Sequence, residues 1–364
     1  MDILIFILVI VVLIVVHEFG HFVVAKLSGM RVDEFGLGYP PRAMTVAKVG
    51  GTSYTLNWLP LGGFVKIYGE DGDGAGPNSF SKRPRILQAL VLVAGIAMNL
   101  FFAYVLITGA LIAGTPRALA PEELARAKNV ELAVVNVLPN TPAARAGIQP
   151  GDMIISATDA VGQWRASDPE SFSTFVDSSK GVAIILDLQH NGQEQSIIAT
   201  PAAGVASSDP RRYALGVEVG TVGVVPLSFG TAIIEGASLT WGATELTAEG
   251  LWQFFFGIFT LHPDFSQVAG PIGIAVAGGA EVKQGLSNIF IFVAEISISL
   301  ALVNLLPIPA LDGGRLLIVI IESVTRRPLK VKKEIINAIT EVCFILLIIL
   351  MFVVSAHDIS KVVW

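Results

Sequence analysis

The sequence is poor in charged residues and in cysteine. Only 15% of its 364 residues are Asp, Glu, Lys or Arg, against about 25% in soluble chains, while 53% are hydrophobic and the mean hydropathy is +0.68. The single cysteine, Cys343, excludes an internal disulfide framework, and we interpret it as a small hydrophobic residue of an apolar run. The net charge of -6 argues against a nucleic-acid partner, which requires a basic surface. This composition predicts an integral membrane protein with a soluble insert.

Four apolar runs are long enough to cross a bilayer, which takes about 20 helical residues. The first run lacks the basic start and the cleavage site of a signal peptide, so we expect it to be retained. The third is interrupted by Asn304, Pro307, Pro309 and Gly313-Gly314. The predicted spans cover residues 3–25, 86–113, 289–321 and 336–355.

Lysine and arginine gather in two segments that a four-span arrangement places on one side of the membrane. Eight lie between spans one and two, from Lys26 to Arg85, and five lie between spans three and four, from Arg326 to Lys333. Cytoplasmic loops carry such an excess, so both segments are expected in the cytoplasm. The acidic segment between spans two and three, and both termini, are then expected outside.

The segments between the spans show two further patterns. Residues 32–70 contain short, half-apolar runs separated by Gly50-Gly51 and Gly62-Gly63, which predicts hairpin-like strands at or dipping into the membrane. Residues 128–205 alternate short strands with turns, and residues 140–152 predict a short helix closed by Gly147 before a tight turn. This second pattern resembles a PDZ domain, an α+β module, which implies a peptide or protein ligand.

Residues 226–260 combine Trp241, Trp252 and other aromatic side chains with small and polar ones. This predicts an amphipathic helix in the outer membrane interface, with a core-facing helix of the soluble domain as the alternative. Residues 262–285 are rich in glycine and are predicted to form a loop.

The predicted fold is a polytopic α-helical membrane protein with four transmembrane helices, a membrane-associated β element and an inserted extracytoplasmic PDZ domain. Its parts are 1–31 (first helix), 32–85 (reentrant β element and loop), 86–114 (second helix), 115–225 (outer segment with the PDZ domain), 226–285 (interfacial helix and Gly-rich loop), 286–322 (third helix), 323–335 (cytoplasmic loop) and 336–364 (fourth helix and tail).

The first apolar run contains His17-Glu18-Phe19-Gly20-His21. On a helix this spacing puts both imidazoles on one face, where they can hold one zinc ion, and it puts a glutamate beside them as general base. Each ionisable residue at the centre of a membrane helix costs about 2.5–3.5 kcal/mol, so three within five positions require compensation, which a metal ion supplies. The alternative is that these residues mark the headgroup end of the helix, close to Lys26.

Catalytic zinc usually has three protein ligands and an open position for water. Asp312 is the best candidate for the third, because it follows a Pro- and Gly-broken segment in an apolar run at the depth of His17. Glu295 and Glu322 are rivals that lie too near the outer and inner ends of that run.

Four stretches in chain order resemble the site-2 protease family of intramembrane zinc metalloproteases, above all its bacterial regulator of sigma-E protease branch. They are residues 17–21, 62–66 (Gly-Gly-Phe-Val-Lys), 270–273 (Gly-Pro-Ile-Gly) and 304–314. The chain departs from well-known members in one respect, because only one PDZ domain fits between residues 115 and 225, where they carry two.

The resemblance implies a zinc-dependent endopeptidase that cleaves single-span membrane proteins, such as anti-sigma factors or signal-peptide remnants, in the bacterial inner membrane. His17, His21 and Asp312 would bind Zn²⁺, and Glu18 would be the general base on the cytoplasmic side. Asn304 and the β element would bind substrate, the latter by strand addition. A scaffold with an inactive site and a metal carrier are the competing functions. Glu18 argues against the first, and a single closed site argues against the second. The residues of the β element expected to bind substrate are Gly63, Phe64, Val65 and Lys66.

Overall fold

The computed structural model describes residues 2–363 except 71–73, 75, 161, 166–167, 191–192, 206–210, 261–268 and 327–332. The chain divides into two compact units. The helical unit comprises Met1–Gly109 and Gly230–Trp364, and the sheet unit comprises Ala110–Phe229.

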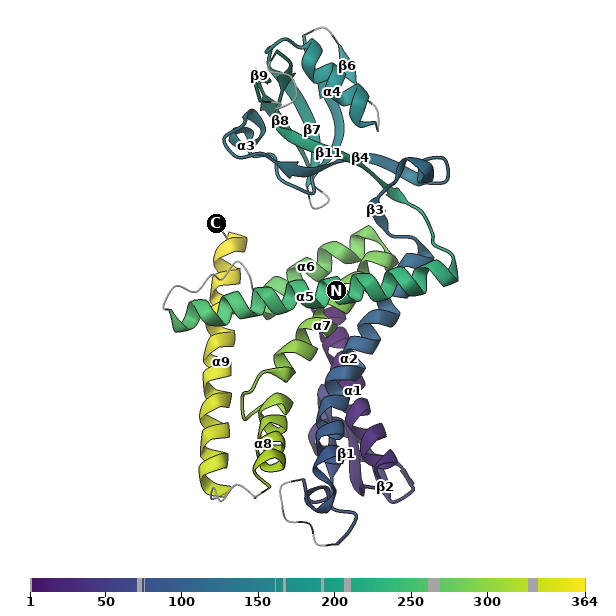
Figure 1. Ribbon diagram of the computed structural model, residues 1–364, viewed down its shortest axis with the longest axis vertical. Helices are drawn as coiled ribbons and strands as arrows, with labels where there is room; N and C mark the ends of the chain where they lie inside the picture. Colours follow the sequence, from purple (N-terminus) through teal and green to yellow (C-terminus); the bar gives the residue numbers. More distant parts are fainter. Residues whose placement is uncertain are drawn as a thin grey trace. The chain divides into compact units, whose positions relative to one another are not determined.

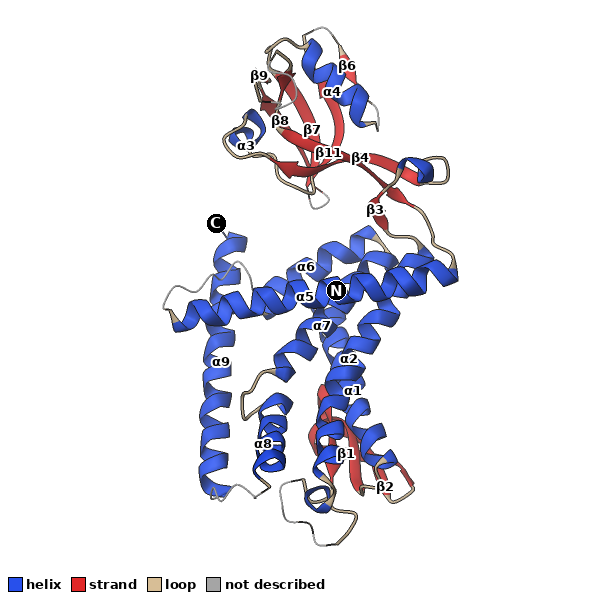
Figure 2. Ribbon diagram, viewed as in Figure 1, coloured by secondary structure: helices blue, strands red, loops and turns tan. Residues whose placement is uncertain are grey.

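Long apolar helices dominate the helical unit (Figures 1 and 2). Four described segments are long and apolar enough to cross a membrane, in agreement with the four predicted runs: Ile5–Leu27, Arg85–Ala113, Leu286–Leu305 and Ala338–Ser360. The helices are α1 (Asp2–Leu27), α2 (Arg85–Ala113), α5 (Phe229–Phe259), α6 (Pro271–Gln284), α7 (Leu286–Leu305), α8 (Asp312–Thr325) and α9 (Lys333–Val363).

The third predicted span is two helices rather than one. Helix α7 ends at Leu305, the chain is non-helical over 306–311, and α8 starts at Asp312. Pro307 and Pro309 cause the break, because proline lacks an N–H and disfavours helical geometry in the residue before it. Asp312 is therefore the first residue of α8, whereas the apolar run over 289–321 predicts that it lies within one long third helix.

The predicted glycine-rich loop over 262–285 is also wrong for its second half, which forms α6; residues 261–268 lie outside the described part of the chain. Pro271 takes the first helical position, which suits its fixed φ angle. A Cβ atom at Gly278 would lie 2.9 Å from the ring of Phe292 in α7. The glycine permits close helix packing here, so its presence did not mark a loop.

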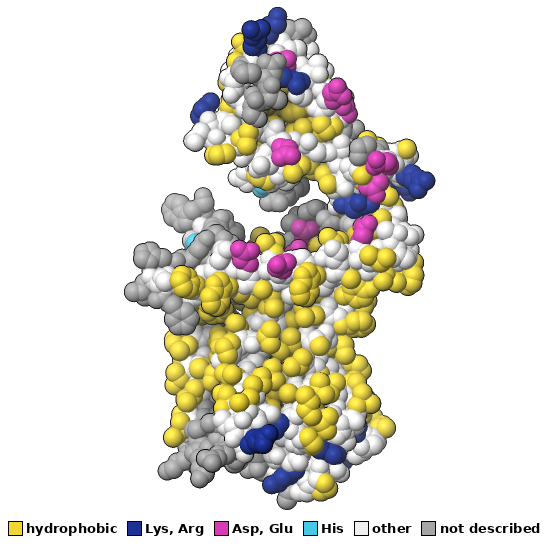
Figure 3. Space-filling model, in the orientation of Figure 1, with side chains coloured by type: hydrophobic (Ala, Val, Ile, Leu, Met, Phe, Trp, Pro, Cys, Tyr) yellow, Lys and Arg dark blue, Asp and Glu magenta, His cyan; other side chains and the backbone are white. Residues whose placement is uncertain are grey.

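Helix α5 runs across the direction of α1, α2 and α9 in Figure 1. It groups with the helical unit from Gly230 onward, and Gly236 fits against Thr108 of α2, so it is not a core helix of the soluble domain. Trp241 and Trp252 are more than 70% exposed. In Figure 3, acidic side chains lie along α5, hydrophobic ones form a broad belt over the helices, and basic ones gather at the opposite end of this unit.

The β element consists of two long antiparallel strands, β1 (Val32–Val49) and β2 (Thr52–Ile67). The first part of β1, residues 32–37, pairs on one side with residues 53–56 of β2 and on the other with residues 63–67. The folded ribbon is therefore a small sheet in which residues 63–67 form an edge. Gly62 has a φ angle of 88°, and a Cβ there would lie 2.8 Å from Ile14 of α1. Glycine thus lets this edge lie directly against α1.

The sheet unit has a seven-stranded sheet among its described residues, in the order β3-β11-β4-β5-β7-β8 with β6 beside β5. Its core contains Leu132, Phe172 and Leu186. The predicted short helix is α3 (Pro142–Ala146), and Gly147 ends it with a φ angle of 83°. The other elements are β3 (Pro116–Ala118), β4 (Lys128–Val137), β5 (Met153–Thr158), β6 (Gln163–Trp164), α4 (Pro169–Ser178), β7 (Ile184–His190), β8 (Gln193–Ala199), β9 (Ala202–Ala203), β10 (Tyr213–Ala214) and β11 (Val217–Val224), with 3-10 turns at Phe80–Lys82 and Pro121–Glu123.

Candidate metal centre and active site

Helix α1 presents two buried histidines to the interior of the helical unit. His17 and His21 are each 6% exposed, and their Nε2 atoms lie 3.1 Å apart. The spacing of four residues places them on one face of the helix. Gly20 lies between them along the chain, and any Cβ there would collide with the backbone carbonyl of Ala94 in α2. Glycine at this position therefore lets α2 approach the two histidines.

Asp312 of α8 completes the cluster. Its Oδ2 atom lies 2.9 Å from Nε2 of His17 and 3.1 Å from Nε2 of His21. The break between α7 and α8 makes this possible, because it puts the carboxylate at the start of a new helix rather than within a continuous one. Within the described chain, these three residues form a cluster of side chains that can bind a metal ion. Their potential ligand atoms all lie within 4.8 Å of one another, close enough to share one ion.

The donor set fits a catalytic metal ion. Two imidazole nitrogens and one carboxylate oxygen, with a fourth position for water, are a known ligand combination of catalytic zinc. Ligand atoms about 2.0–2.1 Å from one tetrahedral zinc ion lie about 3.3 Å from each other, slightly more than the 2.9–3.1 Å found here. Three lone-pair donors converging in a buried place need a cation or shared protons between them. A small outward movement of the side chains would admit the ion.

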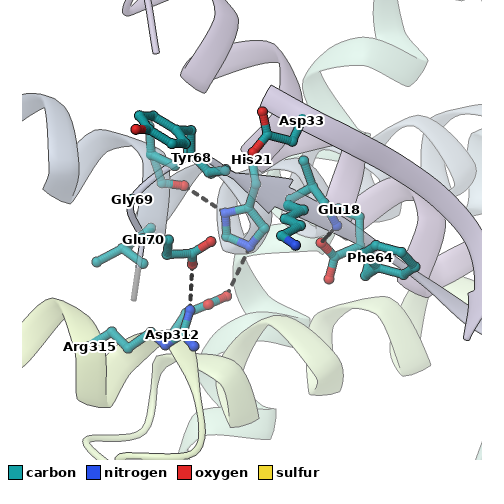
Figure 4. A pocket seen from close by; sticks show the side chains of 14 residues that line it. Glu18, His21, Asp33, Phe64, Tyr68, Gly69, Glu70, Asp312 and Arg315 are labelled. Atoms are coloured by element: carbon teal, nitrogen blue, oxygen red, sulfur yellow. Dashed lines mark hydrogen bonds and ion pairs between the residues drawn. The ribbon is translucent and has the colours of Figure 1, made fainter. Parts of the chain in front are cut away.

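Glu18 lies beside this cluster and faces the same cavity (Figure 4). The cavity measures about 690 Å³ and is lined by His21, Asp312 and Glu18 together with residues of β2. An Oε2 atom of Glu18 accepts a hydrogen bond of 3.0 Å from the backbone N–H of Val65. The ion pair between Arg315 and Glu70 lies at the same cavity.

The residues predicted to bind substrate differ in whether they line the cavity beside the cluster. Phe64, Val65 and Lys66 line the cavity, and Gly63 precedes them on the same edge of the sheet. Asn304 lies in the last turn of α7, before the break, and is not among the residues that line this cavity.

The two rival ligands lie elsewhere. Glu322 pairs with Arg85 at 2.6 Å, and Glu295 is an exposed residue of α7. Neither contributes to the cluster of His17, His21 and Asp312.

The contribution of α2 was not predicted from the sequence. Asn99 is completely buried, and its Nδ2 atom lies 3.3 Å from Nδ1 of His17. Val91, two turns earlier, accepts a 2.7 Å hydrogen bond from Nδ1 of His21 through its backbone carbonyl. A signal for Asn99 was present, since polar residues within membrane helices are costly and tend to be functional. The carbonyl of Val91 has no signature in the sequence, because every residue carries one.

The fold and the site together define a helical metallopeptidase with its His-Glu-x-x-His motif in an apolar helix long enough to cross a membrane. The chain belongs to peptidase family M50, whose family model matches residues 5–350. This match confirms the family to which the motifs pointed.

Named relatives cover almost the whole chain. Zinc metalloprotease RasP of Oceanobacillus iheyensis is 28% identical over 98% of this chain and 98% of its own length. Membrane metalloprotease ARASP, chloroplastic, of Arabidopsis thaliana is 29% identical over 91% of this chain and 73% of its own. A Nostoc protein is 33% identical over 90% of this chain and 88% of its own length. A solved PDZ domain of an SdrC-like protein from Listeria innocua has 16% identity and a TM-score of 0.21, and covers 24% of this chain and 92% of its own.

Proposed function

We propose that this protein is a zinc-dependent intramembrane endopeptidase that cleaves the transmembrane segments of single-span membrane proteins. The observation that carries the proposal is the meeting of His17, His21 and Asp312 next to Glu18. His17, Glu18 and His21 lie within Ile5–Leu27, a segment long and apolar enough to span a membrane. A metallopeptidase centre in such a segment suits substrates whose scissile bond is itself in the membrane.

His17, His21 and Asp312 would hold the zinc ion. Bound zinc supplies a Lewis acid that lowers the pKa of water and polarises the scissile carbonyl. Glu18 accepts the proton of the attacking water at its carboxylate and then delivers it to the leaving amine. Its place in the cavity beside Asp312 and His21 suits both transfers.

The edge strand formed by residues 63–67 of β2 would bind the substrate backbone. The N–H of Val65 points away from β1 and toward the cavity, since it donates to Glu18. An unwound substrate segment that adds to this edge would take over the Val65 N–H and release Glu18 for catalysis. Strand addition requires an extended segment, so substrate spans with helix-weakening residues are expected to be preferred.

The surface of the helical unit supports a location in the bacterial inner membrane. A hydrophobic belt covers the helices, and basic side chains gather at the end that holds the β element (Figure 3). This end would face the cytoplasm, by the excess of Lys and Arg in cytoplasmic loops. Both termini and the sheet unit would then lie outside, with α5 in the outer interface. The sheet unit would act as a PDZ domain that binds a peptide or protein segment.

A reconstitution experiment tests this function. The purified chain in detergent would be incubated with a tagged single-span protein, before and after removal of metal by a chelator. We expect cleavage that stops on chelation and returns when zinc is restored. One zinc ion per chain without any cleavage of several such substrates would favour a scaffold over an enzyme.

A further inference from the structure

Each of the two histidines in the cluster uses its second ring nitrogen, Nδ1, to contact helix α2. Nδ1 of His21 lies 2.7 Å from the backbone oxygen of Val91, and Nδ1 of His17 lies 3.3 Å from the side-chain amide of Asn99. Between these two residues, a Cβ at Gly95 would lie 2.8 Å from Nε2 of His17. Val91, Gly95 and Asn99 are four residues apart and share one face of α2. This face therefore packs against both histidines, and Val91 on it also lines the cavity.

The contact at His21 fixes its tautomer. A carbonyl oxygen only accepts hydrogen bonds, so Nδ1 of His21 carries the proton and donates it to Val91. Nε2 of His21 is then left with its lone pair directed at the cluster. Metal-ligating histidines are commonly oriented in this way by an acceptor at the other ring nitrogen.

His17 also needs a hydrogen-bond acceptor for a proton on Nδ1, and the group next to this nitrogen is a side chain rather than a backbone carbonyl. If zinc is bound through Nε2 of His17, its Nδ1 carries the proton and needs an acceptor, and the group beside it is the carboxamide of Asn99. As placed, the amide turns Nδ2 toward the ring and leaves Oδ1 buried with no partner within the described chain. Amide oxygen and nitrogen positions are assignments that a half-turn exchanges. The exchange costs the amide no hydrogen bond, since it replaces Nδ2···Nδ1 with Oδ1···H–Nδ1.

The backbone around Asn99 is held in place independently. Ser297 of α7 is completely buried and donates a 2.8 Å hydrogen bond to the backbone oxygen of Asn99. This contact fixes α2 against α7 without touching either histidine.

We propose that Asn99 is a positioning residue, whose Oδ1 accepts the Nδ1 proton of His17 and so keeps the Nε2 lone pair available to zinc. The inference rests on the proposed zinc site and names a residue outside the ligand set. It assigns the acceptor for His21 to the backbone and the acceptor for His17 to a side chain of the same helix face. A substitution can remove the Asn99 side-chain acceptor, but it cannot remove the backbone carbonyl of Val91.

Three full-length variants test this role by zinc affinity, measured in detergent by competition with a chelator. Asn99→Leu keeps the branched shape of the side chain and removes the acceptor, so we expect zinc affinity to fall about 10- to 100-fold. Asn99→Asp restores an acceptor and should bind zinc within a few-fold of wild type. Ser297→Ala removes only the contact to the Asn99 backbone and should leave zinc affinity unchanged.

Thermal unfolding of the metal-free proteins separates positioning from structural loss. Asn99→Leu should unfold no earlier than wild type, since leucine suits an apolar helix contact. If Asn99→Leu does not accumulate, Asn99→Ala is expected to give the same fall in zinc affinity. Wild-type affinity in the leucine or alanine variant, or an equal loss in Asn99→Asp, would overturn the role of Asn99. His17→Ala in the same assay reports on the zinc site itself: if it binds zinc as wild type does, the site proposal fails rather than this one.

Discussion

Both units bury apolar side chains, but among the described residues it is the helical unit that buries a cluster of potential metal ligands beneath a largely apolar surface. The sheet unit encloses an apolar core, in which Leu132, Ile184 and Leu188 are completely buried. The helical unit encloses His17, His21, Asn99 and Ser297, while large apolar side chains of its helices are exposed. A core of the first kind is what water drives a chain to form. An interior of the second kind, beneath an apolar surface, is typical of a chain surrounded by lipid, where polar groups face inward and serve function.

The difference predicts that substitutions in the two units affect different properties. Changes among the buried polar groups of the helical unit should remove chemistry or metal and leave the fold. Changes in the core of the sheet unit should remove stability and leave the metal.

Glu18→Gln is expected to have the largest effect on activity. The amide keeps the shape of the carboxylate but cannot accept a proton from water, so cleavage should fall by about 10²- to 10⁴-fold. Zinc content should remain that of wild type, because Glu18 is not one of the three residues whose ligand atoms converge. Metal analysis and a cleavage assay on one preparation check both statements. Substantial cleavage by this variant would remove Glu18 from its role.

Asp312→Asn is expected to reduce both metal binding and cleavage. The substitution keeps the volume but replaces a charged oxygen ligand with a weaker neutral one, so zinc affinity should fall at least about 100-fold. Glu295→Gln is the matched control, since Glu295 is an exposed carboxylate of α7. Glu322→Gln is a second control and loses the charge that pairs with Arg85. If Asp312→Asn holds zinc and cleaves normally while a control is inactive, the third ligand lies elsewhere.

Leu186→Ala tests the other unit. Leu186 is 1% exposed in the sheet core, and its truncation should destabilise this unit by about 2–5 kcal/mol. Ile198→Ala is the matched control, because Ile198 is 67% exposed and should change stability by less than about 0.5 kcal/mol. Pulse proteolysis of the sheet unit in the intact chain measures both. Zinc content should be unchanged, and its loss in Leu186→Ala would show that the two units do not fold independently.

The smallest predicted effect is a pH dependence in the sheet unit. Ser156 and Ser196 donate hydrogen bonds of 2.6 and 2.7 Å to the Asp187 carboxylate and lower its pKa below the ordinary value of 3.8. Because the folded pKa is lowered, the stabilisation is present above the unfolded pKa and is lost as the pH falls through the folded pKa. Asp187→Asn should therefore cost less than about 1 kcal/mol at pH 7, and the difference from wild type should shrink below pH 3.8. If Asp187→Asn and wild type differ in stability by the same amount at pH 7 and below pH 3.8, the lowered pKa of Asp187 is contradicted.

Hydropathy and motif spacing predicted the four apolar segments and the residues that meet at the cluster, because ionisable groups are costly in apolar runs unless they serve a site. Pro307 and Pro309 predict a break in the helix before Asp312. The residues at which one helix ends and the next begins depend on packing between 306 and 314, which the sequence does not show. The glycine content of residues 262–285 predicts a loop at Gly278, although glycine also marks close helix contacts such as that with Phe292. The sequence does not pair Asn99 with His17, because the two residues are 82 positions apart and only the packing of α1 on α2 brings them together.

The position of the cleaved bond is the most direct test of the central claim. The chain and a tagged single-span protein would be reconstituted in liposomes, and the products would be identified by mass spectrometry with and without a zinc chelator. The account predicts a cut within the apolar span of the substrate, and only when zinc is present. A cut confined to the soluble flanks, or one that persists at full rate after zinc is removed, would contradict it.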